Sequence, residues 1–360
     1  MKEFFWAIAQ RIADVGGRLY LVGGAVRDKF LGVEPKDFDY CVTGVTEEEF
    51  VSLFPEAEKS GKTFPVFRIM GVEFAFPRTE KGKVGTIEQD LYRRDLTINS
   101  MAVDVLSGEL FDPFGGREDI QRRVIRATSS HFKSDPSRVY RVARFAAKYG
   151  FSIESETLKY MRELKPALPR LFPEQVFEEL RKALNTQKSS VFFKVMRDTQ
   201  VLDVHFKEIQ ALDHNFDHDM DVVDSLVGQR FETDWEATVF AGLVLYLDKS
   251  QIKELGKRIS LPAKWVKAGV EAAKSLLQAQ KFNELSNIDK VAFLEAVSKS
   301  AIGAKGIEAV YRASGIDIHF AHLATAMLDA VNGKTVKLPK GKEAAKILRQ
   351  KREEWLSKAV

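Results

Sequence analysis

The chain has 360 residues, of which 45% are hydrophobic and 29% charged, and it carries a formal net charge of +4, as an ordinary soluble protein does. This length exceeds what one compact core usually holds, so we expect two or more globular units. The longest apolar run, residues 239–247, is well below the roughly 18 residues that cross a bilayer, so no membrane segment is predicted.

The first residues predict a helix rather than a signal peptide. Residues 3–15 place Phe4, Ile8 and Ile12 at helical spacing, and they lack the apolar core and cleavage site of a secretory leader. Cys41 is the single cysteine, which excludes an internal disulfide, and we expect it to be a small packing residue. These features predict a cytoplasmic protein.

A glycine turn follows the first predicted strand. Residues 19–22 form a short apolar run typical of a buried strand, Gly23 and Gly24 interrupt it, and residues 25–30 predict a helix. Glycines at a strand-to-helix turn let the backbone approach a phosphate, and the helix start offers free N–H groups. Arg27 adds a fixed positive charge, so this turn is a candidate phosphate site.

Two aspartates accompany the second predicted strand, residues 38–43. Side chains alternate along a strand, so Asp37 and Asp39 are expected to project from one face. Mg²⁺ prefers a few carboxylates together with water and substrate phosphates, which this pair could supply; a polar turn before an exposed strand is the alternative. Glu73, on a predicted strand over residues 72–76, is either a third carboxylate of this site or an exposed strand residue.

Between these strands and the next motif the pattern changes from apolar to polar. Thr46 followed by Glu49 fits a capping box, which predicts a helix over residues 46–54. Residues 64–69 predict another strand. Residues 79–89 are polar and rich in Lys and Gly, and predict a mobile loop.

The block of residues 90–101 gathers charged and polar side chains. We expect a helix here that places Asp95 and Asn99 on one face, because they are four residues apart. Arg93 and Arg94 precede them directly. Taken alone, this block fits an ion-paired helix start.

A row of residues at intervals of three follows. Asp135, Arg138, Arg141 and Arg144 are expected to lie along one helix, winding slowly around its axis. Asp135 and Arg138 present an acceptor beside a forked donor, which is complementary to the edge of a nucleobase. Arg141 and Arg144 lie further round and suit phosphates or structural ion pairs.

Four motifs in a fixed order carry a family resemblance. They are Gly-Gly-x-Val-Arg-Asp, Asp-x-Asp, Arg-Arg-Asp-x-Thr-Ile-Asn and Asp-Pro-x-Arg-x-x-Arg-x-x-Arg-Phe, at residues 23–28, 37–39, 93–99 and 135–145. Together they resemble the class II tRNA nucleotidyltransferase and bacterial poly(A) polymerase family, strongly over residues 15–185. The resemblance implies an α+β fold, in which a small mixed-sheet nucleotidyltransferase head at residues 1–128 precedes an all-α neck (129–190), body and tail (191–360).

The resemblance also implies a set of site residues and partners. Asp37 and Asp39 would be the catalytic carboxylates and Mg²⁺ ligands, CTP and ATP the substrates, and the tRNA 3′ end the acceptor. Asp135 and Arg138 would act as a protein template that selects the base, and Asp95 and Asn99 would position the sugar. The other nucleotide-binding residues would be Gly23, Gly24, Arg27, Arg94, Arg141 and Arg144.

Three departures from the family pattern bear on activity. The segment 79–89 is shorter than usual, as it is in members that add only CC. Ser134 replaces an acidic residue, which we interpret as a missing brace for Arg138, and Gln175 replaces an arginine in the last motif. We rank complete CCA addition first, then CC addition, then poly(A) synthesis, and last a non-catalytic RNA-binding protein. The oligomeric state is not predicted.

The C-terminal half predicts helices with few chemical landmarks. A candidate metal cluster comprises His205, Asp213, His214, Asp217, His218, Asp219 and Asp221. Residues 244–249 resemble a phosphohydrolase helix whose His-Asp pair has become apolar, which favours a degenerate scaffold over a second hydrolase. The last 27 residues or so are basic, which indicates either a solvated face or a grip on RNA, through Lys334, Lys337, Lys340, Lys342, Lys346, Arg349, Lys351, Arg352 and Lys358.

Overall fold

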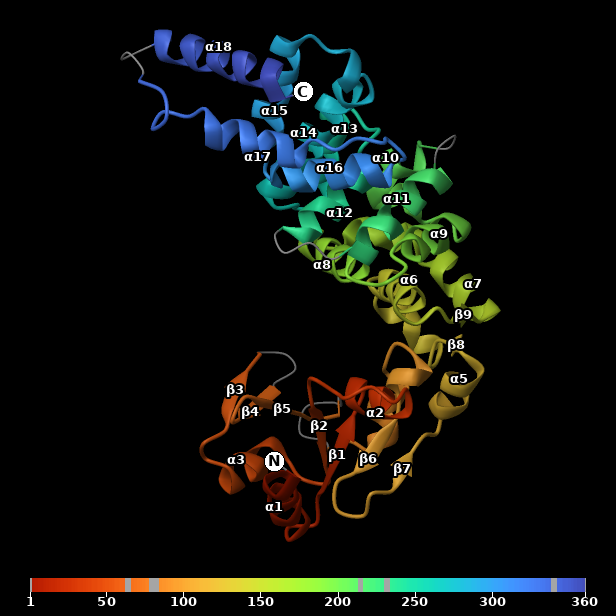
Figure 1. Ribbon diagram of the computed structural model, residues 1–360. Coiled ribbons are helices and arrows are strands. Elements are labelled where there is room, and N and C mark those ends of the chain that lie inside the picture. The colour runs from red at the N-terminus through yellow and green to blue at the C-terminus, as the bar shows by residue number, and fades with distance from the viewer. Residues whose placement is uncertain are drawn as a thin grey trace. The chain divides into compact units, whose positions relative to one another are not determined.

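The computed structural model describes residues 2–61, 66–77, 84–212, 216–229, 234–337 and 342–359 (Figure 1). The chain divides into two compact units, one of residues 1–146 with 150–164 and the other of residues 147–149 with 165–360. Each unit is described by itself. The expectation of more than one unit is thereby confirmed, whereas the three-part division into head, neck and body remains a prediction.

The first unit is built on a mixed sheet of seven strands in the order β3-β4-β5-β2-β1-β6-β7. The pair β2 and β5 is parallel, and the other neighbours are antiparallel. The strands are β1 (Arg18–Val22), β2 (Asp39–Thr43), β3 (Glu58–Ser60), β4 (Val66–Ile69), β5 (Val72–Ala75), β6 (Ala102–Asp104) and β7 (Leu110–Phe111); β8 (Val124–Ile125) and β9 (Ser152–Ile153) form a separate parallel pair.

Helices complete this unit. They are α1 (Lys2–Ala13), α2 (Gly24–Phe30), α3 (Glu47–Leu53), α4 (Ile87–Tyr92), α5 (Gly116–Arg122), α6 (Arg138–Tyr149) and α7 (Ser155–Glu163), with 3₁₀ turns η1 (Thr97–Asn99) and η2 (Ser130–Ser134). Strand alternation gives the sheet two apolar faces. Tyr40 stacks between the rings of Phe5 and Phe74 on one face, while Cys41 is buried beside Leu91 of α4 on the other.

The second unit is helical throughout its described residues. It contains η3 (Lys165–Arg170), α8 (Pro173–Leu184), α9 (Ser190–Asp198), α10 (Leu202–Gln210), α11 (Phe216–Gln229), α12 (Trp235–Leu243), α13 (Lys249–Arg258), α14 (Ala263–Gln280), η4 (Phe282–Glu284), α15 (Asn287–Ser298), α16 (Gly303–Ala313), α17 (Ala321–Ala330) and α18 (Lys342–Ala359). The predicted α+β fold class is confirmed, with the sheet confined to the first unit in the part of the chain that the structure describes.

Several local predictions are confirmed and others are wrong. Thr46 Oγ1 accepts from the Glu49 amide at 3.2 Å, and the Glu49 carboxylate accepts from the Thr46 amide at 2.7 Å. These two bonds form the predicted capping box. The predicted strand over 64–69 begins at Val66 as β4, and residues 64 and 65 lie outside the described residues. Residues 87–89 open α4 instead of extending a loop, while 78–83 are not described.

Candidate nucleotide-binding and catalytic site

The glycine turn between β1 and α2 is formed as the sequence predicts, and an arginine lies directly over it. Gly23 has φ +68°, a conformation that favours glycine, and a Cβ added there would lie 2.8 Å from Arg94 Nη1. No side chain caps the start of α2, and a Cβ on Gly24 would lie 3.4 Å from Arg27 Nη2. The turn therefore has no room for a larger residue at Gly23 and leaves its backbone close to a fixed positive charge.

The two predicted aspartates lie beside this turn. Asp39 is the first residue of β2 and is paired with Val22, the last residue before the glycines. Both Asp37 and Asp39 are exposed, and neither carboxylate accepts a hydrogen bond from any residue that the structure describes. Desolvation raises the pKa of Asp39 despite the opposing charge of Arg94, and the like charges of Glu73 and Asp37 raise it further.

Glu73 lies next to Asp39 on the parallel strand β5 but has a partner of its own. Its carboxylate accepts from Arg68 Nε at 3.0 Å and forms an ion pair with the same guanidinium. Among the described residues, no group of three or more His, Cys, Asp or Glu side chains could hold a metal ion. Two carboxylates that accept no hydrogen bond from the described residues, and of which Asp37 lies near enough to raise the pKa of Asp39, nevertheless fit Mg²⁺, which takes one or two carboxylates plus water and substrate phosphates.

Arg94 is held in place by Asp90, a residue that the motif analysis did not single out. Its Nε donates to Asp90 Oδ2 at 2.9 Å and its Nη2 lies 2.8 Å from the same oxygen. Burial lowers the pKa of Arg94, but the charge and hydrogen bond of Asp90 outweigh it and raise the pKa overall. Asp90 lies on α4 and Arg94 two residues past its end, and their spacing of four residues still brings the two side chains together.

A largely buried chain of hydrogen bonds joins four further motif residues. Arg27 Nη1 donates to Asn99 Oδ1 at 2.5 Å, and Asn99 Nδ2 donates to Asp95 Oδ1 at 3.0 Å. Arg141 then binds Asp95 Oδ2 through Nε and Nη2, at 2.8 and 2.7 Å. Burial opposes ionisation of Asp95, yet Arg141 and Asn99 outweigh it and lower the pKa of this carboxyl.

The predicted helix over residues 90–101 is wrong. The helix α4 ends at Tyr92, and Leu96 is extended (φ −126°, ψ 145°) because it forms a β-bridge with Ala127. Asp95 and Asn99 still meet, but through the short turn η1. The buried side chain of Asp95 is occupied by its protein partners, so a direct contact with a sugar stays a prediction.

Three guanidinium groups lie around the ring of Phe145. The Cζ atoms of Arg27, Arg141 and Arg144 lie 5.3, 5.7 and 4.2 Å from its centroid. These distances are within the range of cation–π attraction. The ring is buried, so α6 contributes both an ion pair and an aromatic surface to the arginines of this site.

The placement of Asp135 on a helix with Arg138 is wrong. Asp135 precedes Pro136, which disfavours helical backbone, and it is extended (φ −134°, ψ 104°) before α6 begins. Its Oδ1 accepts from the amide and hydroxyl of Ser137, at 2.9 and 2.7 Å.

Arg138 is buried and donates to two backbone carbonyls, those of His131 at 3.0 Å and Arg93 at 2.6 Å. These two bonds brace its guanidinium from the main chain. The hypothesis that Ser134 removes a necessary brace is therefore weakened, because a brace is present without an acidic residue at that position.

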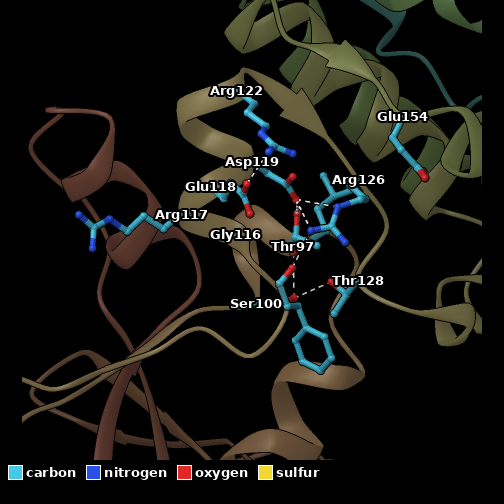
Figure 2. A network of polar contacts seen from close by, with 12 residues as sticks. Thr97, Ser100, Gly116, Arg117, Glu118, Asp119, Arg122, Arg126, Thr128 and Glu154 are labelled. Atoms are coloured by element: carbon cyan, nitrogen blue, oxygen red, sulfur yellow. Dashed lines mark hydrogen bonds and ion pairs between the residues drawn. The ribbon is translucent and has the colours of Figure 1, made fainter.

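A second polar network holds the turn η1 in place (Figure 2). Thr97 donates to Asp119 of α5, and Arg126 donates to Asp119 Oδ2 at 2.9 Å and to the Phe114 carbonyl at 2.7 Å. The hydroxyls of Ser100 and Thr128 lie 2.6 Å apart. The network joins the turn η1 to α5 and to the residues that follow β8. No local spacing predicts it, because its bonded partners are as many as 28 residues apart.

The candidate metal cluster of the second unit does not form among the described residues. His205 is buried, and desolvation together with Arg258 lowers its pKa to about 4. Asp217 is exposed 3.6 Å from Lys194, and His218 lies 3.4 Å from the Tyr246 hydroxyl. Asp213 and His214 lie outside the described residues.

The predicted helix over 244–249 is likewise wrong. Residues 244–248 connect α12 to α13, which begins at Lys249, and Asp248 caps α13 by accepting from the Ser250 and Gln251 amides at 2.7 and 2.9 Å. An Asp N-cap satisfies the free amides of a helix start, which explains the break in the helix here.

Asp219 on α11 is 1% exposed, and neither of its carboxylate oxygens has a hydrogen-bond partner among the residues that the structure describes. Burial raises its pKa to about 7. In the unfolded chain the Asp219 carboxyl ionises near pH 4, so its burial makes the folding stability fall as pH rises from about 4 to 7.

We therefore expect Asp219→Asn to raise the free energy of unfolding at pH 8 by roughly 2–4 kcal/mol and to change it little at pH 4, as measured by urea denaturation. The exposed Asp221→Asn on the same helix is the control, and equal changes in both variants would contradict this assignment.

Two arginines of the basic C-terminal segment form ion pairs within the protein. Arg352 is buried, donates to the Val331 carbonyl at 3.1 Å and pairs with Glu295 at 2.7 Å; Arg349 pairs with the same carboxylate at 3.1 Å. Lys340 and the side chain of Lys342 lie outside the described residues. Part of the basic run is thus structural, because it fastens α18 to α15.

The mixed sheet of the first unit carries a glycine turn, two carboxylates and an arginine, and the second unit is helical in its described residues. Residues 19–77 and 62–126 match the poly A polymerase head domain, and residues 150–212 match the probable RNA and SrmB-binding site of polymerase A. The head-domain match spans the first three motifs, at residues 23–28, 37–39 and 93–99, and so confirms the family resemblance found there. No helix among the described residues has the length and hydropathy to span a membrane.

The chain is also similar to named proteins. It is 42% identical over 215 residues to the multifunctional CCA protein of Haemophilus ducreyi (strain 35000HP / ATCC 700724), covering 54% of this chain and 52% of that protein. The chain thus spans about half the length of this curated relative.

Solved structures share the fold. A CCA-adding enzyme with ATP has a TM-score of 0.78 at 22% identity, with 98% of this chain and 89% of the other covered. The Thermotoga maritima CCA-adding enzyme complexed with tRNA has a TM-score of 0.76 at 23% identity, with 98% and 90% covered.

Proposed function

We propose that the chain is a tRNA nucleotidyltransferase, which adds the 3′-terminal CCA from CTP and ATP without a nucleic-acid template and with Mg²⁺. The observation that carries the proposal is the donor-free pair Asp37 and Asp39 beside the turn of Gly23 and the guanidinium of Arg94. The relative named a multifunctional CCA protein supports the choice of substrates.

In this proposal the head arranges a phosphoryl transfer. The 3′-hydroxyl oxygen of the RNA attacks the α-phosphorus, the bond from that phosphorus to the β-bridging oxygen breaks, and pyrophosphate leaves. Asp37 and Asp39 would hold the metal, which when bound supplies charge neutralisation and a lowered pKa of the attacking hydroxyl. The glycine turn and Arg94 would receive the triphosphate, since backbone amides and a guanidinium both bind phosphate oxygens.

The remaining predicted residues take supporting roles. Arg27, Asn99, Asp95 and Arg141 form the buried hydrogen-bonded chain that fixes the position of the site. Arg138, whose guanidinium is braced by two carbonyls, and Asp135, whose Oδ1 accepts from Ser137, would present a donor and an acceptor to the edge of the base. Arg144 would support the arginines around Phe145.

The wider assignments follow from the same proposal. The sheet-bearing residues 1–128 would be the head, 129–190 the neck that presents the base-selecting motif, and 191–360 the body and tail that bind tRNA. A cytoplasmic location agrees with a tRNA substrate. CC addition alone stays the second candidate because the segment 79–89 is short.

The test is the product length on tRNA lacking its 3′ end. We expect CTP alone to extend the RNA by two nucleotides and CTP with ATP to extend it by three, resolved on a sequencing gel. Two nucleotides with both substrates present would select the CC-adding alternative. Long tails from ATP alone would select poly(A) synthesis, and no extension at all would refute a transferase.

A further inference from the structure

The helical unit contains a groove that the proposed chemistry of the head does not use. It is lined by residues of α11, α16 and α17, of which α16 packs against both others, and it has a volume of about 720 Å³. This size lies within the range of small-molecule sites, about 300–1,000 Å³. The groove therefore has room for a nucleotide-sized ligand.

Small side chains create the hollow and polar ones surround it. Ala309 and Ala321 are buried at its base, where a methyl group leaves space that a longer side chain would fill. Lys305 and Arg312 stand seven residues apart on α16, hence on one face of that helix. Both are exposed, so the groove has an apolar base and a cationic rim.

The cations of the rim are available for a ligand. Among the described residues, neither Lys305 nor Arg312 forms an ion pair or a side-chain hydrogen bond. Glu308 is the one carboxylate in the lining, and it is engaged elsewhere: its Oε2 accepts from the amides of Phe320 and Ala321, at 2.5 and 2.6 Å. This carboxylate caps the positive end of α17 and is not directed at the two cations.

From this arrangement we infer that the groove binds a nucleoside phosphate. Arg312 offers a forked donor that matches phosphate oxygens and Lys305 offers a compact charge. Ser225 and Gln229, four residues apart on α11, can hydrogen-bond a sugar or base that lies on the alanines. The ligand is either a free nucleotide or one nucleotide of a bound RNA, since both present the same phosphate and base.

Two binding measurements on the full chain distinguish these sources. For the free ligand, calorimetric titration with ATP is expected to show a site that weakens at least about tenfold in the double variant Lys305→Ala with Arg312→Ala. For RNA, the affinity for tRNA lacking its 3′ end, measured by fluorescence anisotropy, is expected to fall about tenfold. The slope of log affinity against log salt should then decrease by roughly one to two.

Two further variants separate a built site from diffuse charge. Lys274→Ala with Lys299→Ala removes the same charge from exposed lysines outside the groove and is expected to change neither measurement. Ala313→Trp keeps the charge but fills the hollow and is expected to weaken the same ligand. The inference is overturned if the rim variant matches the Lys274 and Lys299 control in both assays, or if Ala313→Trp binds like wild type. The rate of CTP incorporation at saturating RNA should be unchanged in all of them, which separates this test from that of the head.

Discussion

Asp39→Asn is expected to lower the rate of CTP incorporation into tRNA by roughly a thousandfold. A metal acting on the transferred phosphoryl group is worth several kcal/mol of transition-state stabilisation, and each 1.36 kcal/mol is about a factor of ten. The amide keeps the size of the side chain but removes the charge that a metal needs. Because Asp39 is exposed and accepts no hydrogen bond from the described residues, folding should be unaffected.

The matched control for this variant is Asp14→Asn. Asp14 is an exposed carboxyl after α1 whose contact is a single bond from Gln10 at 3.1 Å, so its loss should leave the rate within a factor of two or so. Single-turnover incorporation of labelled CTP is the measurement, with circular dichroism to verify the fold. A near wild-type rate for Asp39→Asn would refute the assignment of the metal carboxylates.

Arg141→Met is expected to destabilise the first unit by about 3–5 kcal/mol at pH 7, because it leaves the Asp95 carboxylate buried without its charge partner. The native pair lowers the pKa of Asp95, so its stabilisation is present above the ordinary pKa of an aspartate and is lost only as pH falls through the lower folded value. Urea denaturation measures the change in the free energy of unfolding, and hydrogen exchange of the amides in β1 and α6 locates it in the first unit.

Two comparisons make this second prediction specific. Asp95→Asn combined with Arg141→Met should cost less than Arg141→Met alone, since no uncompensated charge is then buried. Arg122→Met breaks an exposed pair with Glu118 and should change the free energy of unfolding by only about 0.5 kcal/mol. If Arg141→Met behaved like Arg122→Met, the ion pair would not be a structural element of the site.

The contrast between Asp39 and Asp95 divides the motif residues into two kinds. Asp39 accepts no hydrogen bond from the described residues and is paired with Val22 next to the glycine turn, so its carboxylate is available for chemistry. Asp95 accepts four hydrogen bonds, from Leu96, Asn99 and two nitrogens of Arg141, and so acts through the residues that it fixes. Substitution of the first should reduce kcat without loss of stability, whereas substitution of the second should reduce both.

Local rules determined the frame of this protein. Apolar residues before two glycines specify β1 and the turn into α2, and a capping box specifies α3. The predicted strand over residues 38–43 begins only at Asp39, as β2, so strand alternation does not place Asp37, and a shared face of Asp37 and Asp39 stays a prediction. The preference of residues before proline for extended backbone was also available for Asp135, and applying it would have avoided the incorrect helix.

Tertiary structure decided which motif side chains are free and which are engaged. Asp95 and Arg141 are 46 residues apart and Arg27 and Asn99 are 72 apart, so no helical or strand periodicity relates them. The two carbonyls that brace Arg138, and the Glu308 carboxylate that turns away from the groove cations, depend equally on how separate segments pack. Sequence periodicity predicts which residues are neighbours within one helix or strand. A buried charge costs free energy unless a complementary group pairs with it, and the packing of distant segments determines which group that is.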